Sequence, residues 1–477
     1  MSDKISYSCH GDIAILTVQN PPVNALSQPV RQGLWDGMDR AESEQGIRAI
    51  MIVGEGRAFF AGADITEFGK PPLKPHLPDL INRIESSPLL IVASMHGVSL
   101  GGGLEVALGC HYRIAVPTAC VGLPEVHLGL LPGAGGTQRL PRLAGVIAAL
   151  ELMTTGRHID AEEGHKLGVI DKIQDGDPNL NGIAYTQKLL DQNTPRRPVS
   201  DMPAPEKINW DEAFEKALKS GRGQISPAWC VRAVQASVEK PFEEGLEAER
   251  QIFYDLMQTE QRQGMIHAFF SQRAVSNLPE LKGITPRPLK NIALIGGGTM
   301  GAGIATSALL SGLNVTVLEM SKHATQAAFD RIENNLSGAK KRGKIDSQQY
   351  ENIINHSLNL VTDYGKLSDM DLVIEAVFEE MAVKKRVFEE LDRICKPGAI
   401  LASNTSYLDI NEIAASTSRP ADVLGLHFFS PAHVMKLLEV VVADATAPDV
   451  AATGFALGKT LGKISVRAGV CDGFIGN

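Results

Sequence analysis

The alternation of apolar and polar positions changes character along the chain. In the first third, short apolar runs alternate with glycine-rich turns and short helical stretches, as in parallel strand–helix–strand units; examples are IAILTVQ, IRAIMIVG and LLIVASMHG. The segment 191–210 is rich in proline and charge and is typical of a surface connection. From there to Asn277, apolar residues recur at spacings of three and four, which predicts helices.

A second change of pattern occurs at about residue 285. The stretch LPELKGITPRPLK, residues 278–290, interrupts the helical pattern, and an apolar strand follows in NIALIGG. A chain of 477 residues is also too long for one ordinary core. We therefore expect an α/β protein with a first domain over 1–190, a helical linker region over 191–284 that completes it, and a second domain over 285–477.

Composition excludes several classes of protein. The hydrophobic fraction of 44% and the charged fraction of 21% are typical of a soluble globular protein. A net charge of −9 argues against nucleic-acid binding, because no segment concentrates enough lysine and arginine to bind phosphates. No apolar run reaches the roughly 18 residues of a membrane span, and the N-terminus lacks the apolar core of a signal peptide. We expect the protein in the cytosol or a similar compartment.

The residues that bind metals or form disulfides show no functional spacing. Six cysteines are scattered without a CxxC pattern, and we interpret them as reduced thiols; they are Cys9, Cys110, Cys120, Cys230, Cys395 and Cys471. The twelve histidines show no HExxH or similar pattern. The sequence therefore predicts no metal site.

A glycine-rich turn between two apolar strands carries a cofactor signal. NIALIGGGTMGAGIATSALLSGLNVTVLEMS contains Gly296-x-Gly298-x-x-Gly301, then a helix of small residues, then a strand that ends at Glu319. The glycines allow a tight turn, close approach of the backbone to a pyrophosphate and close packing of helix on strand. Since Glu319 is expected to bind the ribose hydroxyls and repel a 2′-phosphate, the pattern predicts NAD in preference to NADP.

Four later segments resemble the L-3-hydroxyacyl-CoA dehydrogenase family: VIEAVFEEMAVKKRVFEEL, ILASNTSYLDI, GLHFFSPAHVMKLLEVV and DGFIGN. The resemblance implies that His427 is the base that takes the hydroxyl proton during hydride transfer, and that Glu439 orients its imidazole. An imidazole suits this role because its ordinary pKa lies near working pH and a carboxylate fixes its tautomer. Taken by itself, His427 also fits a hydrogen-bonded histidine at a strand end.

The same resemblance assigns further positions. Ser406 in SNTS and Asn477 at the end of GFIGN are expected to contact the substrate. Glu379 and Lys384 match positions that line the cofactor pocket. The chain departs from many relatives at Ser430, where they carry asparagine.

Three segments resemble the crotonase, or enoyl-CoA hydratase/isomerase, family over residues 1 to about 190: GEGRAFFAGADITEF, HGVSLGGGLEVALGC and GLPEVHLGLLPGAGGTQRLPRLAG. The resemblance implies a ββα spiral fold and a thioester carbonyl held between the backbone amides of Ala63 and Gly102. Glycine lets the backbone approach the thioester, and the helix that starts there directs its dipole at the developing enolate oxygen.

The two catalytic glutamates of that family fall on Glu105 and Glu125. Hydration needs a water held for attack at C3 and a proton delivered at C2, and two carboxylates facing one water do both. The presence of both favours hydration. The alternatives are a helix N-terminal charge for Glu105 and an exposed loop acid for Glu125, and Asp64 is either structural or pocket-lining.

Together these resemblances imply a multifunctional β-oxidation enzyme of type 1, with a crotonase part followed by a Rossmann-type NAD-binding domain. Such a protein hydrates 2-trans-enoyl-CoA to L-3-hydroxyacyl-CoA, with isomerisation of 3-enoyl-CoA as an option at the same site, and oxidises the alcohol with NAD to 3-ketoacyl-CoA. The alternative is a hydratase whose second half is only an NAD-binding module. A bacterial cytoplasmic location is expected, with a peroxisomal one as the alternative.

The resemblance also bears on what surrounds these sites. Relatives continue past GFIGN with helical domains that close the hydroxyacyl site, so we expect a fragment, or a truncated form with reduced dehydrogenase turnover. The expected partners are acyl-CoA substrates, with no nucleic acid and no membrane insertion. The acyl chain-length preference and the oligomeric state stay open, with a monomer among the options.

Overall fold

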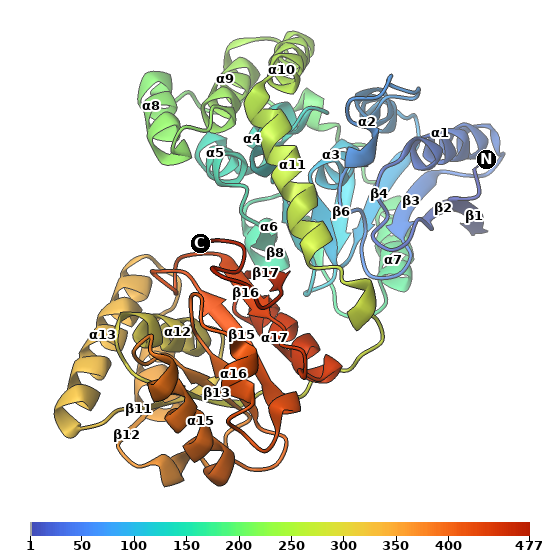
Figure 1. The fold of residues 1–477 in the computed structure, drawn as a ribbon. Helices are drawn as coiled ribbons and strands as arrows, with labels where there is room; N and C mark the ends of the chain where they lie inside the picture. The colour runs from blue at the N-terminus through green and yellow to red at the C-terminus, as the bar shows by residue number, and fades with distance from the viewer. Residues whose placement is uncertain (1) are drawn as a thin grey trace. The chain divides into compact units, whose positions relative to one another are not determined.

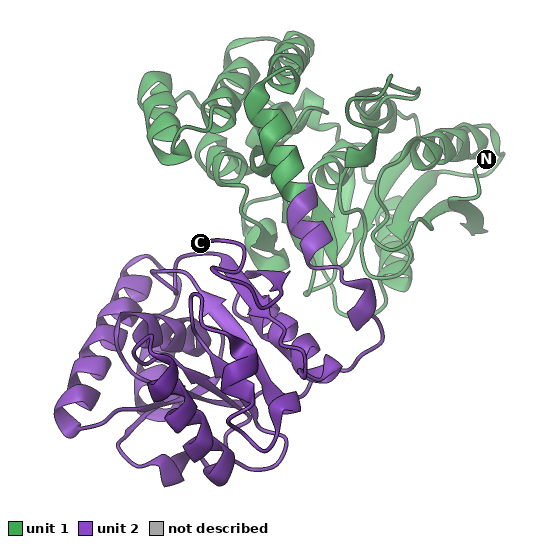
Figure 2. Ribbon diagram, in the orientation of Figure 1, with its two compact units in different colours: residues 1–269 green, residues 270–477 purple. Residues whose placement is uncertain are grey.

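The computed structural model describes residues 2–477, which form two compact units (Figure 2). Unit 1 comprises the described residues up to 269, and unit 2 comprises residues 270–477. The division lies within helix α11 (Glu260–Val275), before the proline-containing stretch where the sequence pattern changes. Each unit combines helices with mainly parallel strands around its own hydrophobic core, so the predicted α/β class is confirmed.

The larger sheet of unit 1 has six strands in the order β1-β2-β3-β4-β6-β9 (Figure 1). Only the pair β1 and β2 is antiparallel. Every residue of β3 and β4 is buried, which explains why these strands are continuous apolar runs. The strands are β1 (Ile5–His10), β2 (Ile13–Val18), β3 (Ala49–Gly54), β4 (Leu90–Met95), β6 (Tyr112–Ala115) and β9 (Lys172–Ile173).

A second, three-stranded sheet of unit 1 consists of β5 (Val98–Leu100), β7 (Cys120–Gly122) and β8 (Ile159–Asp160). Strands β5 and β7 run parallel, so the segments that follow them start at the same edge. The helices of this part are α1 (Gln28–Ser43), α2 (Leu77–Glu85), α3 (Gly102–Gly109), α4 (Gly136–Ala144), α5 (Val146–Thr155), α6 (Ala161–Lys166) and α7 (Pro178–Asp191).

The rest of unit 1 is helical, with α8 (Trp210–Gly221), α9 (Ser226–Glu239) and α10 (Phe242–Met257) before α11. Helix α9 packs against α4 and α5, and α10 packs against α4 and α9. Buried side chains of α9, including Cys230 and Val234, belong to the same core cluster as the strands. Residues 191–269 therefore complete the first unit instead of forming a separate domain.

A buried ion pair connects two helices of unit 1. Arg139 on α4 donates through Nη2 to Glu85 Oε2 on α2 at 2.6 Å and to Asn82 Oδ1 at 2.9 Å. The side chains of Arg139 and Glu85 are 1% and 6% exposed. Since neither charge has water as an alternative partner, each depends on the other.

Unit 2 contains an eight-stranded sheet in the order β12-β11-β10-β13-β14-β15-β16-β17. Neighbouring strands are parallel except β15 and β16. The strand order reverses direction between β10 and β13, which is where a doubly wound sheet binds ligands at its carboxyl edge. The strands are β10 (Asn291–Ile295), β11 (Asn314–Leu318), β12 (Leu358–Val361), β13 (Leu372–Glu375), β14 (Ile400–Ser403), β15 (Val423–Phe428), β16 (Leu437–Val441) and β17 (Ile464–Ala468).

Helices cover this sheet and supply the rest of its core (Figure 1). They are α12 (Thr299–Leu310), α13 (Lys322–Lys341), α14 (Ser347–Asn352), α15 (Met381–Ile394), α16 (Ile410–Ala414) and α17 (Pro448–Thr460). Within residues 2–477, no helix combines the length and apolar character needed to cross a membrane.

Replacing Arg139 tests the buried ion pair. Arg139→Met keeps an apolar stem but leaves the buried Glu85 carboxylate without its partner, so the free energy of unfolding of unit 1 should fall by about 3–5 kcal/mol. Urea denaturation followed by circular dichroism measures this. Arg48→Met, which breaks the exposed Arg48–Asp12 pair, is the control and should change stability by no more than about 1 kcal/mol. Equal effects of both variants would contradict the argument.

Candidate active sites

The two glutamates predicted from the first unit come from neighbouring strands. Glu105 lies in α3, which follows β5, and Glu125 begins the short helix η2 (Glu125–Leu128), which follows β7. The Gly101 amide donates to the Gly122 carbonyl at 2.8 Å, so the two strand ends stay together. Gly101 has φ +53, and a Cβ there would lie 3.0 Å from Glu125 Oε1. The fold therefore brings both carboxylates to one edge.

Glu105 is a buried carboxylate that backbone amides stabilise. Its side chain accepts through Oε1 from the amides of Ala134 at 2.7 Å and Gly136 at 2.9 Å, and the residue is only 3% exposed. Burial raises the pKa of Glu105, and the two amides act in the opposite direction. These amides explain how a charge is tolerated at the start of an otherwise apolar helix.

Glu125 lies in a different environment. Its Oε2 is buried and has no hydrogen-bond partner among the described residues. Burial, followed by the charge of Glu105, raises the pKa of Glu125 well above its ordinary value. The expected alternative of an exposed loop acid does not describe this side chain. The pKa of both carboxyls is raised, but the two backbone amides that bind Glu105 favour its charged form, so the two environments differ.

Two backbone amides lie near this pair. A Cβ added to Gly102 would lie 3.3 Å from the Ala63 nitrogen, so the two predicted oxyanion-hole residues are neighbours. Neither the Ala63 amide nor the Gly102 amide donates a hydrogen bond to another described residue. Asp64, next to Ala63, instead caps a short helix: its Oδ1 accepts from the Thr66 amide at 3.0 Å and the Thr66 hydroxyl at 2.7 Å. These contacts give Asp64 a structural role as a helix cap, and whether it also lines a pocket stays a prediction.

The sequence did not single out a third buried carboxylate, Glu249 on α10. Its oxygens accept from the Gly135 amide at 2.7 Å, the Thr137 amide at 3.0 Å and the Thr137 hydroxyl at 2.6 Å. Burial, followed by the charge of Glu105, raises the pKa of Glu249 to about 7. In the sequence Glu249 is one of several acidic residues in a helical stretch, and no motif marks it.

In unit 2 the glycine-rich turn adopts a geometry that only glycine tolerates. Gly296 has φ +92, and a Cβ on Gly301 would lie 1.8 Å from the Gly296 carbonyl oxygen. Gly298 forms the N-cap of α12, and a Cβ there would meet nothing within 4 Å. The turn therefore packs helix on strand through Gly301 while its outer backbone stays open to a ligand.

Glu319 follows β11 at the same edge of the sheet. Its Oε1 accepts from the Gly297 amide at 2.6 Å, which holds the carboxylate beside the glycine turn. An open turn and a helix N-terminus supply amide donors for the phosphates of a dinucleotide, and an anchored acid supplies an acceptor for its free ribose hydroxyls. The residues present thus fit NAD.

His427 and Glu439 form a cross-strand pair. They lie directly opposite each other in the antiparallel ladder of β15 and β16, and the His427 Nδ1 to Glu439 Oε2 distance is 2.6 Å. The residues are 4% and 0% exposed. Glu439 Oε1 also accepts from the amides of Ile475 at 3.2 Å and Gly476 at 2.7 Å, so the end of the described chain holds the carboxylate in place.

The other predicted residues of unit 2 form a hydrogen-bonded chain beside this pair. Asn477 Nδ2 donates to the Ser406 carbonyl at 3.3 Å, and the Ser406 amide donates to Glu379 Oε1 at 2.5 Å. Lys384 Nζ lies 3.2 Å from Glu379 Oε2 and donates to Glu375 at 2.7 Å. Lys384 is fully buried, and its ion pair with Glu379 helps to fix the position of that carboxylate.

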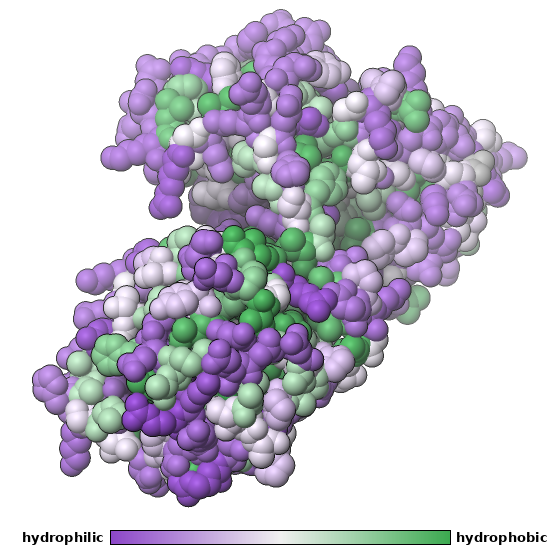
Figure 3. Space-filling model, viewed as in Figure 1, coloured by the Kyte–Doolittle hydropathy of each residue, from purple (hydrophilic) through white to green (hydrophobic). Residues whose placement is uncertain are grey.

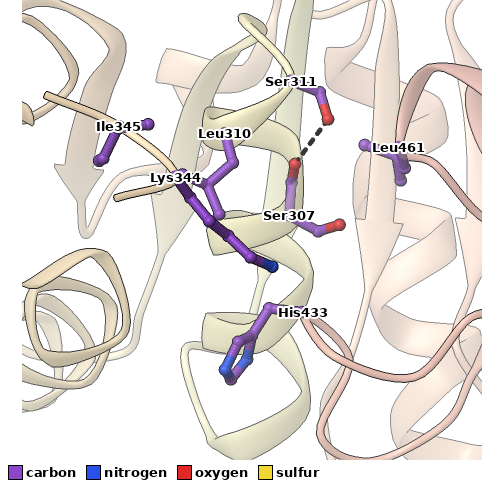
Figure 4. A pocket seen from close by; sticks show the side chains of 7 residues that line it. All are labelled: Ser307, Leu310, Ser311, Lys344, Ile345, His433 and Leu461. Carbon is purple, nitrogen blue, oxygen red and sulfur yellow. Dashed lines mark hydrogen bonds between the residues drawn. The ribbon is translucent and has the colours of Figure 1, made fainter. Parts of the chain in front are cut away.

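Two surface features of unit 2 lie outside these contacts. A pocket of about 350 Å³ is lined by seven residues, none of them a predicted site residue (Figure 4); they are Ser307, Leu310, Ser311, Lys344, Ile345, His433 and Leu461. Hydrophobic side chains also gather on the visible face of unit 2 (Figure 3). Five exposed hydrophobic residues lie within eight positions of a predicted site residue of unit 2 in the sequence; they are Phe378, Tyr407, Val434, Met435 and Ile475. No group of three or more candidate metal-binding side chains occurs in the described part of the chain.

Comparison with known proteins gives two family matches. Residues 9–193 match the enoyl-CoA hydratase/isomerase model, and residues 291–471 match the 3-hydroxyacyl-CoA dehydrogenase NAD-binding domain. Both matches agree with the resemblances identified in the sequence.

Relatives contain both domains in one chain. The peroxisomal bifunctional enzyme of Danio rerio is 44% identical over 98% of this chain and 65% of its own length. A peroxisomal fatty acid beta-oxidation multifunctional protein of Arabidopsis thaliana is 36% identical over 98% of this chain and 67% of its own length. The chain thus spans about two thirds of these relatives. A solved 3-hydroxybutyryl-CoA dehydrogenase from Escherichia coli is 42% identical over 40% of each chain, with a TM-score of 0.39.

The environment of Glu125 predicts a pH-dependent stability. Because its pKa is raised in the folded protein, the unfolded chain loses this proton first as pH rises above about 4.5, and the folded state becomes relatively less stable until pH passes the folded pKa. Glu125→Gln removes this cost. The variant should exceed the wild type in unfolding free energy by about 1 kcal/mol or more at pH 8, with the difference shrinking toward pH 4.

Urea denaturation at several pH values between 4 and 8 measures this difference. Glu247→Gln, an exposed position on α10, is the control and should show no such trend. A stability gain that is the same at every pH would show that Glu125 is not held protonated.

Proposed function

Because the chain belongs to the family of fatty acid beta-oxidation multifunctional proteins, we propose that it catalyses two consecutive reactions of that process. Unit 1 hydrates 2-trans-enoyl-CoA to L-3-hydroxyacyl-CoA, and unit 2 oxidises this alcohol with NAD to 3-ketoacyl-CoA. The observation that carries the proposal is the pair of carboxyls at one sheet edge: Glu105 is buried and held by two amides, and Glu125 has a buried Oε2 without a partner among the described residues. The amides of Ala63 and Gly102 lie beside this pair.

The geometry of unit 1 supports hydration in a specific way. The amides of Ala63 and Gly102 would donate hydrogen bonds to the thioester oxygen as negative charge develops on it. Glu105, charged and held by the 134–136 amides, would orient a water and take its proton as the oxygen adds at C3. Glu125, whose pKa is raised by desolvation and by the charge of Glu105, would deliver a proton to C2. In the isomerisation of 3-enoyl-CoA, a charged carboxylate of the pair would take the C2 proton, and a protonated carboxyl of the pair would deliver a proton to C4.

The geometry of unit 2 supports alcohol oxidation. Glu439 accepts from His427 Nδ1, so Nε2 is left as the acceptor for the substrate hydroxyl proton. Ser406 and Asn477 lie together and would hold the substrate beside that nitrogen. NAD, when bound, supplies the hydride acceptor. Gly296, Gly298 and Gly301 would receive its phosphates, with Glu319 on the ribose hydroxyls and Glu379 beside the nicotinamide end.

The two reactions follow each other chemically, because the product alcohol of the first is the substrate of the second. The acyl-CoA thioesters are therefore the proposed partners. As for compartment, the names of the vertebrate and plant relatives support the peroxisomal alternative, while a bacterial cytoplasmic location stays a prediction.

Supplying crotonyl-CoA with and without NAD tests the proposal directly. We expect 3-hydroxybutyryl-CoA without NAD, and acetoacetyl-CoA with stoichiometric NADH when NAD is added. Glu105→Gln and Glu125→Gln should each lower the hydration rate by about two orders of magnitude or more, the scale for losing an acid or base group, without changing the affinity for NAD. Hydration at the wild-type rate in either variant would contradict the assignment.

A variant of the second unit separates the two activities. His427→Gln should abolish NADH formation from 3-hydroxybutyryl-CoA while hydration of crotonyl-CoA continues unchanged. If the wild type hydrates crotonyl-CoA but forms no NADH, unit 2 acts only as an NAD-binding module.

The anchored carboxylate of Glu319 predicts the choice of cofactor. It would repel the 2′-phosphate of NADP, so NAD should bind at least about tenfold more tightly, a difference of about 1.4 kcal/mol. Isothermal titration calorimetry with both nucleotides measures this. Glu319→Ala should narrow the gap, and equal affinities in the wild type would refute the role of Glu319.

A further inference from the structure

Four consecutive amides at the start of α4 alternate between two buried carboxylates. We call residues 134–137 the acid-binding turn. The amides of Ala134 and Gly136 both donate to Glu105 Oε1, whereas those of Gly135 and Thr137 donate to Oε1 and Oε2 of Glu249. Adjacent peptide groups thus point to opposite sides of the turn, and each side is occupied by an acid from a different helix.

The approach of α10 to α4 makes this contact possible. A Cβ on Gly245 would lie 2.1 Å from Gln138 Oε1, so this glycine lets the helices approach closely. Glu249 lies one turn further along α10 on the same side and is only 1% exposed. Gln138 Nε2 donates to the Thr137 hydroxyl at 2.8 Å, and that hydroxyl donates to Glu249 at 2.6 Å. The carboxylate is therefore held by three donors and supported by a fourth group.

We propose that Glu249 is a positioning residue of the hydratase site. By holding one side of the acid-binding turn, it directs the other two amides at Glu105. This inference rests on the proposed hydration activity. Glu249 touches neither substrate nor water in this role. It acts through Glu105, whose Oε1 stays bound to the turn while Oε2 has no hydrogen bond from the described residues.

Charge alone would not explain this arrangement. Glu105 and Glu249 are both buried, and the charge of Glu105 raises the pKa of Glu249, while Arg250 and Arg139 lie near enough to favour the charged forms. An acid with no function at the site would be more stable farther from Glu105 and Glu125, because a like charge nearby raises the cost of burying it. The position of Glu249 is explained if its carboxylate orients the acid-binding turn.

The test compares variants of Glu249 in the full chain with crotonyl-CoA as substrate. Glu249→Gln replaces one acceptor oxygen with an NH₂ donor, which cannot accept from Gly135 or Thr137, so the turn should rotate. We expect kcat for hydration to fall by about tenfold or more with KM changed by less than about threefold. Glu249→Asp keeps both acceptor oxygens and should recover part of the loss. Glu247→Gln, exposed on the same helix, is the matched control.

A double variant separates positioning from a general structural effect. If Glu249 acts through Glu105, then Glu249→Gln should change the residual activity of Glu105→Gln by less than about twofold. The same factor of loss in both backgrounds would overturn the proposal, as would a rise in KM with kcat unchanged or a wild-type kcat in Glu249→Gln.

A milder change keeps the test decisive if Glu249→Gln does not fold. Thr137→Val removes one donor to Glu249 and leaves all three carboxylates, so it should lower kcat less than Glu249→Gln and leave KM unchanged. A wild-type kcat in Thr137→Val together with Glu249→Asp would also overturn the proposal. Absence of hydration by the wild type would instead count against the proposed function.

Discussion

Unit 1 depends on a single turn of backbone that takes the place of water around buried acids. An isolated charge in an apolar interior is strongly unfavourable, yet Glu105 and Glu249 are both almost completely buried. The acid-binding turn supplies each of them with two amides, and it lies at the positive end of α4. Gly135 has φ +97, and a Cβ there would lie 1.9 Å from Arg139. The packing of α3, α4 and α10 thus converges on a backbone shape that requires glycine.

In unit 2, backbone amides also hold carboxylates, and in each case an amide binds one of the two carboxylate oxygens. Glu319 is held by the Gly297 amide, and Glu439 by the Gly476 amide. In Glu439 the second oxygen is then directed at His427, so an amide on one side fixes a tautomer on the other. Holding one oxygen removes the rotational freedom of the carboxylate before any substrate arrives, which is what a preorganised site needs.

The parts of this structure that the sequence predicts are those with local signals. The spacing of the glycines at 296, 298 and 301 marks a turn in the sequence, and the structure explains two of them: Gly296 has φ +92, and a Cβ on Gly301 would lie 1.8 Å from the Gly296 carbonyl oxygen. The pairing of His427 with Glu439 was predicted from the resemblance to a family. The residues of β15 and β16 do not by themselves determine the register in which the two strands pair. Glu249 was missed because its partners lie more than a hundred residues away and helical periodicity treats it as one more polar position. The burial of Lys384 was equally hidden, since its partner Glu375 is an acid within an apolar strand.

The contrast between Glu105 and Glu125 gives the pair a direction. Glu105 is buried and Glu125 is half-buried, and desolvation raises the pKa of each. Desolvation by itself therefore does not decide which of the two holds the proton. The amides of the acid-binding turn break this symmetry by favouring the charged form of Glu105, and that charge in turn raises the pKa of Glu125 further. In the proposed hydration, this one turn would therefore select Glu105 as the base and, through its charge, Glu125 as the acid. The folded state is less stable at high pH as a result, and this cost is inseparable from keeping a proton available on Glu125.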